Sequence, residues 1–475
     1  MPDQPTMQPN ILWICTDQQR HDTIGALGNP YVRTPNIDRL ASEGVAFSHA
    51  FCQSPICTPS RGSFLTGMYP SSAHCCGNGN DHWSGRAPLI TKLLADAGYD
   101  AGLVGKLHLA GAAGRLEPRG DDGYRVFWWS HAPRDHWPEG HDYAGWLMSQ
   151  GFDLAILAQH PESIAPDLHQ TAWCAERAIE FMEAERNGPW VLSVNPFDPH
   201  PLGSLFAPPQ EIAAEYDPDQ MPEPFFRETD LAAQARLDGI DFQTAPRRPE
   251  EFAARRIKAR YYAMIEMIDR MVGRLLESLD RSGQRDNTII IFMSDHGEML
   301  GDHGLLLKGC RFYEGLVRVP LIVSWPAGFQ AGSTSHALVE LIDLAPTLLE
   351  ACQLDRPDEM QGRSLLPMLQ GKRGLRSHRD HVRCEYYRAL NPDAPGKNMQ
   401  LTGSYGTMIR TSQHKLIVYH GHEVGELFDL RDDPEEFNNL WDEPSAARIR
   451  CELLKLSFDA LAQGVDLGPR QVVYY

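Results

Sequence analysis

The residues whose types and spacing could do chemistry begin with a cysteine at the expected start of a helix. Cys57 follows a turn-forming Ser-Pro pair and precedes Pro59 and Arg61, in a run that we expect to be helical as far as Gly67. Proline fits the first turn of a helix, and Cys57 stands where the N-cap residue would stand. Arg61 comes one helical turn later, so its guanidinium can fold back over residue 57. Because a helix N-terminus favours negative charge, the pattern indicates a nucleophile or a ligand; a buried structural cysteine is the alternative.

Two pairs of polar residues follow apolar runs that we expect to be strands. Asp17 and Gln18 come directly after the run at 10–16, and Asp295 and His296 follow a second run far along the chain. Continuous apolar strands are typical of a sheet covered on both faces, and functional groups gather at the carboxyl ends of such strands. The two pairs can meet only if their strands are parallel neighbours in one sheet. Two carboxylates, an amide and an imidazole around one point would suit Ca²⁺, Mg²⁺ or Mn²⁺.

Basic side chains stand at further predicted strand ends. Lys106 and His108 follow a strand expected at 101–104 and lie on the same face, where they could bind an anionic oxygen; a solvated lysine beside a core histidine is the alternative. His200 is flanked by prolines, which hold it rigidly. Together with Arg61, these cations around a metal and a nucleophile would neutralise a tetrahedral oxyanion, which is the chemistry of sulfuryl or phosphoryl transfer.

The run Cys-Thr-Pro-Ser-Arg at 57–61, followed by Leu-Thr-Gly, resembles the signature of the type I sulfatases, members of the alkaline phosphatase superfamily. Further segments within 9–370 match that family in order, with a weaker echo near the C-terminus. The resemblance implies that a formylglycine-generating enzyme oxidises Cys57 to formylglycine, an aldehyde whose hydrate is the nucleophile. It also implies an α/β fold in which helices sandwich a large mixed, mostly parallel sheet, with a smaller C-terminal α+β subdomain.

By the same resemblance, the site binds one divalent cation, Ca²⁺ or Mn²⁺. Its ligands would be Asp17, Gln18, residue 57, Asp295 and His296. Arg61 would stabilise the hydrate of the aldehyde.

The resemblance also assigns roles to the basic residues and to an asparagine. Lys106 and Lys308 would hold the non-bridging oxygens of the ester, and His200 or Lys308 would protonate the leaving alcohol. His108 would then take a proton from the second hydroxyl of the hydrate, so that sulfate leaves and the aldehyde is restored. Asn78 would contact the bound ester, and a simple turn residue is an equal alternative at this position.

The expected substrate is a sulfate monoester of a small alcohol, sugar or phenol. The runner-up reaction is hydrolysis of a phosphonate monoester or phosphodiester, since those esters also carry one negative charge. We expect a Gly- and Pro-rich insertion at 110–150 and a Pro-rich excursion at 202–249 to leave little room for a second substituent. The insertion contains the aromatic residues Trp128, Trp129, Trp137, Tyr143 and Trp146. They could stack on the leaving group or hold the loop together.

A non-enzymatic alternative is a relative of these enzymes that only binds an anion. It would apply if Cys57 were never oxidised, because the nucleophile would then be missing. The mass of the peptide around residue 57 separates this alternative from a hydrolase.

The bulk composition limits the alternatives. The length of 475 residues suggests two or three domains. The pattern changes after about residue 370, where the basic stretch 371–379 is typical of a linker, so we expect a catalytic domain at 1–370 and a C-terminal subdomain at 371–475 with a small antiparallel sheet and a helix. The 63 acidic and 44 basic residues give a net charge of −19, which argues against nucleic acid or an anionic membrane as a partner. The N-terminus shows no secretory signal and the 10 cysteines have no disulfide or zinc pattern, so we expect a cytoplasmic protein. A mature form whose leader has been removed is the alternative. A homo-oligomer stays open.

Overall fold

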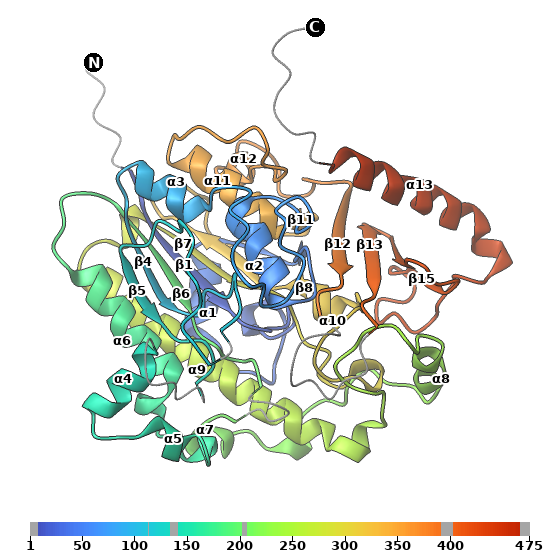
Figure 1. Ribbon diagram of the computed structural model, residues 1–475, viewed down its shortest axis with the longest axis horizontal. Helices are drawn as coiled ribbons and strands as arrows, with labels where there is room; N and C mark the ends of the chain where they lie inside the picture. Colours follow the sequence, from blue (N-terminus) through green and yellow to red (C-terminus); the bar gives the residue numbers. More distant parts are fainter. Residues whose placement is uncertain (1–7, 113, 134–140, 202–206, 391–401, 466–475) are drawn as a thin grey trace, which may run out of the picture.

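An eight-stranded sheet forms the centre of the described chain in the computed structural model, which covers residues 8–112, 114–133, 141–201, 207–390 and 402–465 (Figure 1). The strands stand in the order β10-β2-β9-β7-β1-β6-β4-β5. From β7 to β5 neighbouring strands are parallel, whereas β9 is antiparallel to both β2 and β7. The prediction of a large mixed, mostly parallel sheet is confirmed.

The strands of the large sheet are β1 (Asn10–Thr16), β2 (Val45–Phe47), β4 (Asp100–Gly105), β5 (Val126–Trp129), β6 (Trp190–Asn195), β7 (Thr288–Ser294), β9 (Leu321–Ser324) and β10 (Ser333–Ser335). A second sheet consists of β3 (Ala50–Phe51), β8 (Arg318–Val319) and β11 (Val339–Glu340). An antiparallel third sheet consists of β12 (His381–Tyr387), β13 (Tyr405–Thr411), β14 (His414–Tyr419) and β15 (Gly425–Asp429). The α-helices of the described residues are α1 (Pro35–Ser42), α2 (Cys57–Thr66), α3 (Ile90–Asp96), α4 (Asp142–Ser149), α5 (Leu154–Leu157), α6 (Gln170–Glu183), α7 (Gln210–Ala213), α8 (Thr229–Ala235), α9 (Ala254–Arg281), α10 (Glu314–Val317), α11 (Leu344–Ala351), α12 (Leu366–Leu369) and α13 (Ala447–Gln463).

Helices cover both faces of the large sheet, and its central strands are therefore buried along their whole length. In β1, Ile11 and Trp13 point into the core that includes side chains of α2, α3 and α11. Leu12 and Ile14 point into the core that includes side chains of α6 and α9. Figure 1 shows these two layers of helices around the sheet.

The two central strands bring the two polar pairs together. β1 and β7 are parallel neighbours, and Thr16 is the register partner of Ser294. The next residue after each strand is a carboxylate, Asp17 after β1 and Asp295 after β7. The predicted meeting of these two strand ends is confirmed.

The segment at 110–150 is only in part the insertion that its Gly and Pro content suggests. β5 lies within it and pairs with β4 as the parallel edge strand of the large sheet, and α4 follows. The prediction missed this strand because it is short and Gly- and Pro-rich loops surround it. Trp129 is fully buried and Trp128 packs against the core beside α6, so these side chains hold the segment together. Trp137 lies outside the described residues, as do residues 202–206 of the Pro-rich excursion, whose remainder contains α7 and α8.

The expected helices form with shifted boundaries. The helix expected at 86–98 is α3, which begins at Ile90. The long helix expected to begin at Glu250 is α9, which begins later because Ala253 adopts a left-handed conformation and separates it from a preceding 3₁₀ turn. Among the helices of the described residues, none combines the length and the hydropathy that a membrane span requires.

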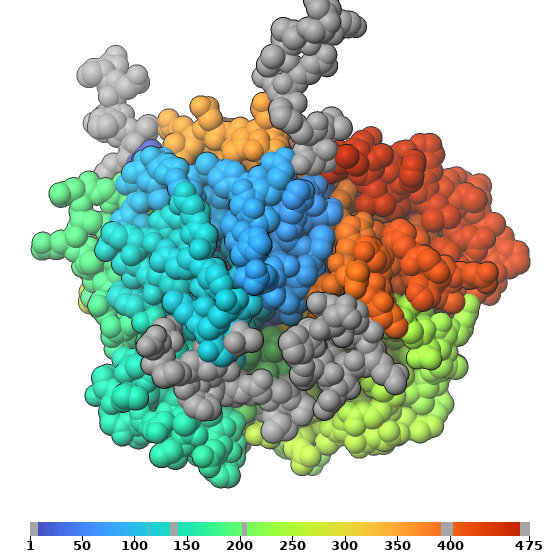
Figure 2. All heavy atoms as spheres, viewed as in Figure 1, coloured from blue at the N-terminus to red at the C-terminus, as the bar shows by residue number. Residues whose placement is uncertain are grey.

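The C-terminal sheet forms as expected, with β14 and β15 at the predicted strands and α13 packed on one face through Leu453. Lys415 of β14 is fully buried and ties this sheet to the rest of the chain: its Nζ lies 2.8 Å from Glu314 Oε1 and 2.6 Å from Glu436 Oε1. Figure 2 shows the segment around α2 between the C-terminal strands and the segment that carries β5. The domain boundary at residue 370 stays a prediction.

Replacing Lys415 should destabilise the fold where the C-terminal sheet meets the rest. Lys415→Ala would remove the cation that the buried carboxylates of Glu314 and Glu436 share, and breaking a buried ion pair in this way costs about 3–5 kcal/mol. The matched control is Lys455→Ala, which breaks an exposed pair with Asp459 and should leave the unfolding temperature nearly unchanged. Thermal unfolding measures both variants, and equal unfolding temperatures for the two would contradict the prediction.

Candidate active site

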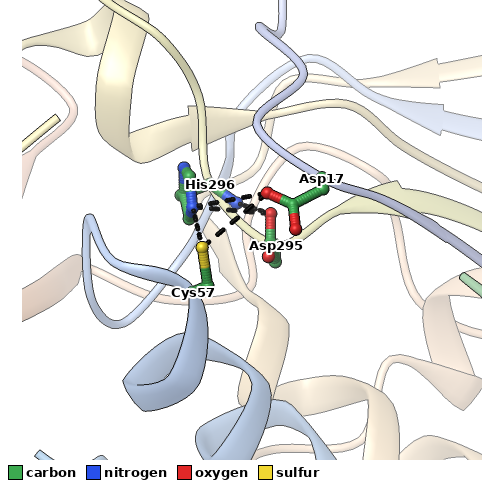
Figure 3. A group of neighbouring side chains, drawn as sticks. All are labelled: Asp17, Cys57, Asp295 and His296. Carbon is green, nitrogen blue, oxygen red and sulfur yellow. Dashed lines mark hydrogen bonds and ion pairs between the residues drawn. The ribbon is translucent and has the colours of Figure 1, made fainter. Parts of the chain in front are cut away.

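Cys57 is the first residue of α2, and its side chain points into a cluster of polar groups (Figure 3). The carbonyl of Ile56 accepts the first helical hydrogen bond, from the Ser60 N–H (3.1 Å), so Ile56 is the N-cap residue. The prediction of Cys57 as the N-cap is thus wrong by one residue, because its own backbone has already entered the helix. The helix ends as predicted at Gly67, in the left-handed conformation.

Four buried side chains meet around one point, namely Asp17, Cys57, Asp295 and His296. Their ligand atoms lie within 4.8 Å of one another. The Cys57 Sγ is 3.1 Å from His296 Nε2 and 3.7 Å from Asp17 Oδ1. The two carboxylates suit Ca²⁺ or Mn²⁺, and the imidazole favours Mn²⁺, so the residues at this point fit a divalent cation.

Backbone groups orient the imidazole and one carboxylate of this cluster. His296 donates from Nδ1 to the Gly297 carbonyl (2.9 Å), so its Nε2 is the nitrogen that faces the cluster. Asp295 Oδ1 accepts from the N–H groups of His296 (2.9 Å) and Gln18 (3.0 Å). The donors come from the residues that follow β1 and β7, so the edge of the sheet itself builds the site.

Arg61 bridges the two carboxylates. Its Nε donates to Asp295 Oδ2 (2.9 Å), and its Nη2 donates to Asp17 Oδ2 (3.3 Å). Its Nη1 donates to the Lys106 carbonyl (3.1 Å). Two buried negative charges beside residue 57 thus hold the guanidinium. The expectation that it folds back over residue 57 itself stays a prediction. The role of Arg61 towards the hydrated aldehyde stays a prediction.

Two lysines reach the cluster from different loops. Lys106 follows β4 directly, and its Nζ lies 2.5 Å from Asp17 Oδ2. Lys308 donates from Nζ to Cys57 Sγ (2.9 Å) and to Gln18 Oε1 (2.8 Å). Both lysines are buried, and an anionic ester beside residue 57 would find its countercharges here.

The charges around Cys57 shift its pKa. Burial and the Asp17 carboxylate act to raise the pKa of the thiol, but nearby cations outweigh them, and the pKa lies below its ordinary value. These cations are Lys106, Lys308 and His296. The site therefore favours an anion at position 57.

Gln18 hydrogen-bonds to a buried carboxylate that the sequence analysis did not single out. Its Nε2 donates to Glu298, whose other oxygen accepts two backbone N–H groups. The Gln18 Oε1 is thereby turned towards Lys308, at the cluster. Glu298 stands two residues after His296, and this closeness to a predicted ligand was a signal that could have identified it. The assignment of Gln18 as a metal ligand stays a prediction.

His200 lies near the cluster with one ring nitrogen already engaged. Its Nδ1 donates to the Pro201 carbonyl (2.8 Å), so a neutral ring carries no proton on Nε2. Burial and the charge of Lys308 hold the pKa of His200 well below its ordinary value. Its predicted contact with the ester stays a prediction.

Asn78 caps the first turn of α2. Its Oδ1 accepts from the Thr58 N–H (3.3 Å), next to residue 57, and its own N–H donates to the Ala389 carbonyl (2.7 Å). The capping contact gives the turn alternative a structural basis, and a contact with the ester stays a prediction.

His108 stands beside a second histidine that the sequence analysis missed. The ring centres of His108 and His131 are 4.7 Å apart, with the rings nearly perpendicular at 70°. His131 follows the end of β5 much as Lys106 follows β4. A correct prediction of β5 would have placed His131 at the same edge of the sheet.

The chain matches two families of known proteins. It matches the sulfatase family over residues 9–354 and the C-terminal part of the N-sulphoglucosamine sulphohydrolase family over residues 301–462. The first match covers most of the large sheet and every residue of the cluster around Cys57.

Related proteins span nearly the whole chain. The arylsulfatase of Clostridium perfringens is 29% identical over 453 residues, which cover 91% of this chain and 90% of that protein. The N-acetylglucosamine-6-O-sulfatase of Bacteroides thetaiotaomicron is 27% identical, over 98% of this chain and 88% of that protein. The crystal structure of the phosphonate monoester hydrolase of Agrobacterium radiobacter superposes with a TM-score of 0.80 at 27% identity, over 97% of this chain and 96% of that one. The chain therefore belongs to the sulfatase family and is a sulfuric ester hydrolase.

Proposed function

We propose that this enzyme hydrolyses the sulfate monoester of a sugar, with a formylglycine made from Cys57 as the nucleophile and one divalent cation beside it. The observation that carries the proposal is the position of the Cys57 Sγ, inside a cluster of metal-ligand donors and 2.9 Å from the Lys308 Nζ. A nucleophile, a metal site and a countercharge for the ester thus share one buried point.

The cation would be held by Asp17, Asp295 and His296, together with Gln18 and residue 57. Ca²⁺ suits the carboxylate oxygens, and Mn²⁺ accepts the imidazole as well. When bound, the cation would supply Lewis-acid polarisation of the ester and would lower the pKa of the nucleophile.

The remaining groups bind the ester and move protons. Lys106 and Lys308 hold the non-bridging oxygens: Lys308 contacts the Cys57 Sγ directly, and Lys106 pairs with Asp17, whose other carboxylate oxygen lies 3.7 Å from that sulfur. Lys308 rather than His200 protonates the leaving oxygen, since His200 gives its Nδ1–H to the Pro201 carbonyl. His108 takes a proton as sulfate leaves; its Nδ1 is buried and has no hydrogen-bond partner within the described part of the chain.

A sulfated sugar is the substrate class that the relatives favour, because one of them is named as an N-acetylglucosamine-6-O-sulfatase. A phosphonate monoester is the second candidate, and the likeness to a phosphonate monoester hydrolase along nearly the whole chain supports it. Both esters carry one negative charge at the reacting group, so the charges of the two lysines do not discriminate between them. The room beside the attacked atom for a second substituent must therefore decide which ester the enzyme prefers.

Cys57 should be converted to formylglycine when the chain is produced together with a formylglycine-generating enzyme. Mass spectrometry of the peptide around residue 57 measures the conversion, and activity should rise in proportion to it. Cys57→Ala should remove activity because it removes the precursor of the nucleophile. Cys174→Ala, at a buried cysteine in the opposite core, is the control and should retain it. Full activity in a preparation that holds only unmodified Cys57 would contradict the mechanism.

Removing the cation should stop turnover. EDTA should abolish activity and added Ca²⁺ or Mn²⁺ should restore it. Asp295→Asn should lower the metal content found by elemental analysis, because a neutral amide is a weaker ligand. Asp269→Asn is the control at another buried carboxylate, which accepts the backbone N–H groups of Asn36 and Ile37, and it should keep its metal. A metal-free preparation with full activity would refute the metal's role.

Matched substrates should separate the two candidate reactions. An aryl sulfate should give the highest kcat/KM among an aryl sulfate, an aryl phenylphosphonate and an aryl phosphodiester, because it has no second substituent to accommodate. Steady-state assays with one leaving group measure the three values. A phosphonate or diester that exceeds the sulfate by more than about tenfold, equal to 1.4 kcal/mol of transition-state binding, would move the enzyme to the second candidate.

A further inference from the structure

The loop after β4 carries two residues of the proposed machinery on a backbone that needs support. Lys106 follows β4 directly, and His108 has a φ of 59°. This left-handed conformation is unfavourable for an L-residue with a side chain, so it persists only where other contacts stabilise it.

Glu117 binds this loop through three consecutive backbone N–H groups. The residue is 1% exposed; its Oε2 accepts from the N–H of His108 (2.7 Å), and its Oε1 accepts from the N–H groups of Leu109 and Ala110 (2.8 Å for Ala110). The indole Nε1 of Trp129, at the end of β5, donates to Oε2 (3.3 Å). Successive N–H groups that converge on one anion form a concave binding site for it, and here the anion is a side chain of the same loop.

The four donors match a carboxylate and do not match a neutral group of the same shape. An ionised carboxylate accepts at both oxygens, and each oxygen of Glu117 has two donors. A glutamine amide can present its oxygen to only one of these two pairs. Its NH₂ group would then face the N–H groups of the other pair, which are donors too.

The ring of His108 is supported from β5. The His131 ring packs against the His108 ring at 4.7 Å between centres. The Trp129 ring in turn stacks on His131, with the ring centres 6.3 Å apart and the planes at 17°. The same tryptophan therefore supports His108 twice, through the Glu117 carboxylate at the backbone and through His131 at the ring.

We propose that Glu117 is a positioning residue, which sets the place of the His108 imidazole at the active site and acts on turnover only through His108. The inference rests on the proposed function, in which His108 takes a proton as sulfate leaves. It also gives the segment at 110–150 a task beyond shaping the entrance of the site, because that segment supplies Glu117, Trp129 and His131.

The test compares Glu117→Gln with His108→Ala in the matured, metal-loaded full chain, with 4-nitrophenyl sulfate as the probe. Glu117→Gln should lower kcat at least about tenfold and change KM less than about threefold, because the ester is still held by Lys106 and Lys308. A burst of 4-nitrophenol release should precede the slow steady state in both variants, since the proton transfer to His108 belongs to sulfate release. Glu117→Asp keeps the charge and should recover part of kcat.

A double-mutant cycle separates positioning from general damage to the fold. Glu117→Gln combined with His108→Ala should be no slower than His108→Ala alone, because the positioned group is already missing. Asp269→Asn, which removes a comparable buried carboxylate with two backbone donors, should combine with His108→Ala multiplicatively. A crystal structure of Glu117→Gln should show the His108 backbone outside the left-handed region or its ring displaced.

Two results would overturn the inference: an unmoved His108 in that crystal structure, or multiplicative effects of Glu117→Gln and His108→Ala. A failure of the proposed function would be recognised by a different result. If His108→Ala alone keeps normal turnover, His108 has no role in catalysis, and the crystal structure of Glu117→Gln still decides whether Glu117 positions it. If Glu117→Gln does not fold, Glu117→Asp takes its place in the crystal structure and the kinetic assay. An unmoved His108 together with the kcat of the wild type would then overturn the inference.

Discussion

The ion triad of Asp17, Arg61 and Asp295 is the interaction on which the rest of the structure depends. Two carboxylates lie side by side with no exposure to solvent, and such an arrangement is stable only if a cation offsets their repulsion. Arg61 does so with two separate donors, one to each carboxylate. The two carboxylates directly follow β1 and β7, and Arg61 lies in α2, so one electrostatic requirement joins two strand ends of the sheet to the helix that carries residue 57.

The triad also explains how the site is oriented. Arg61 and Lys106 contact the Oδ2 atoms, so the Oδ1 atoms of both carboxylates are directed to the cluster around Cys57. The Oδ2 atoms thus face Arg61 and Lys106, and the Oδ1 atoms form the ligand side of the carboxylates. A cation bound at the ligand side would offset the charge that remains and would face the nucleophile, as sulfuryl transfer requires.

Sequence patterns predicted the parts of the site that depend on strand ends and on a local motif. The buried runs that end at Asp17 and Asp295 were sufficient to predict parallel neighbours, because carboxylates after such strands meet at one edge. The partners of Arg61 were not predictable, because residue 57 is close in sequence whereas the carboxylates are distant and attract the cation more strongly. Glu117 left no signal at all, since it binds backbone N–H groups and these are the same for every residue type except proline. β5 was missed because it is a short edge strand, and His131, which follows it, was missed with it.

The paired carboxylates are proposed to hold a cation against residue 57, and anomalous diffraction from crystals of the matured protein grown with Mn²⁺ would locate it. We expect one strong anomalous peak enclosed by Asp17, Asp295, His296 and residue 57, with Arg61 still bridging the two carboxylates from the other side. A peak elsewhere, or no peak at this point in a fully active crystal preparation, would contradict it.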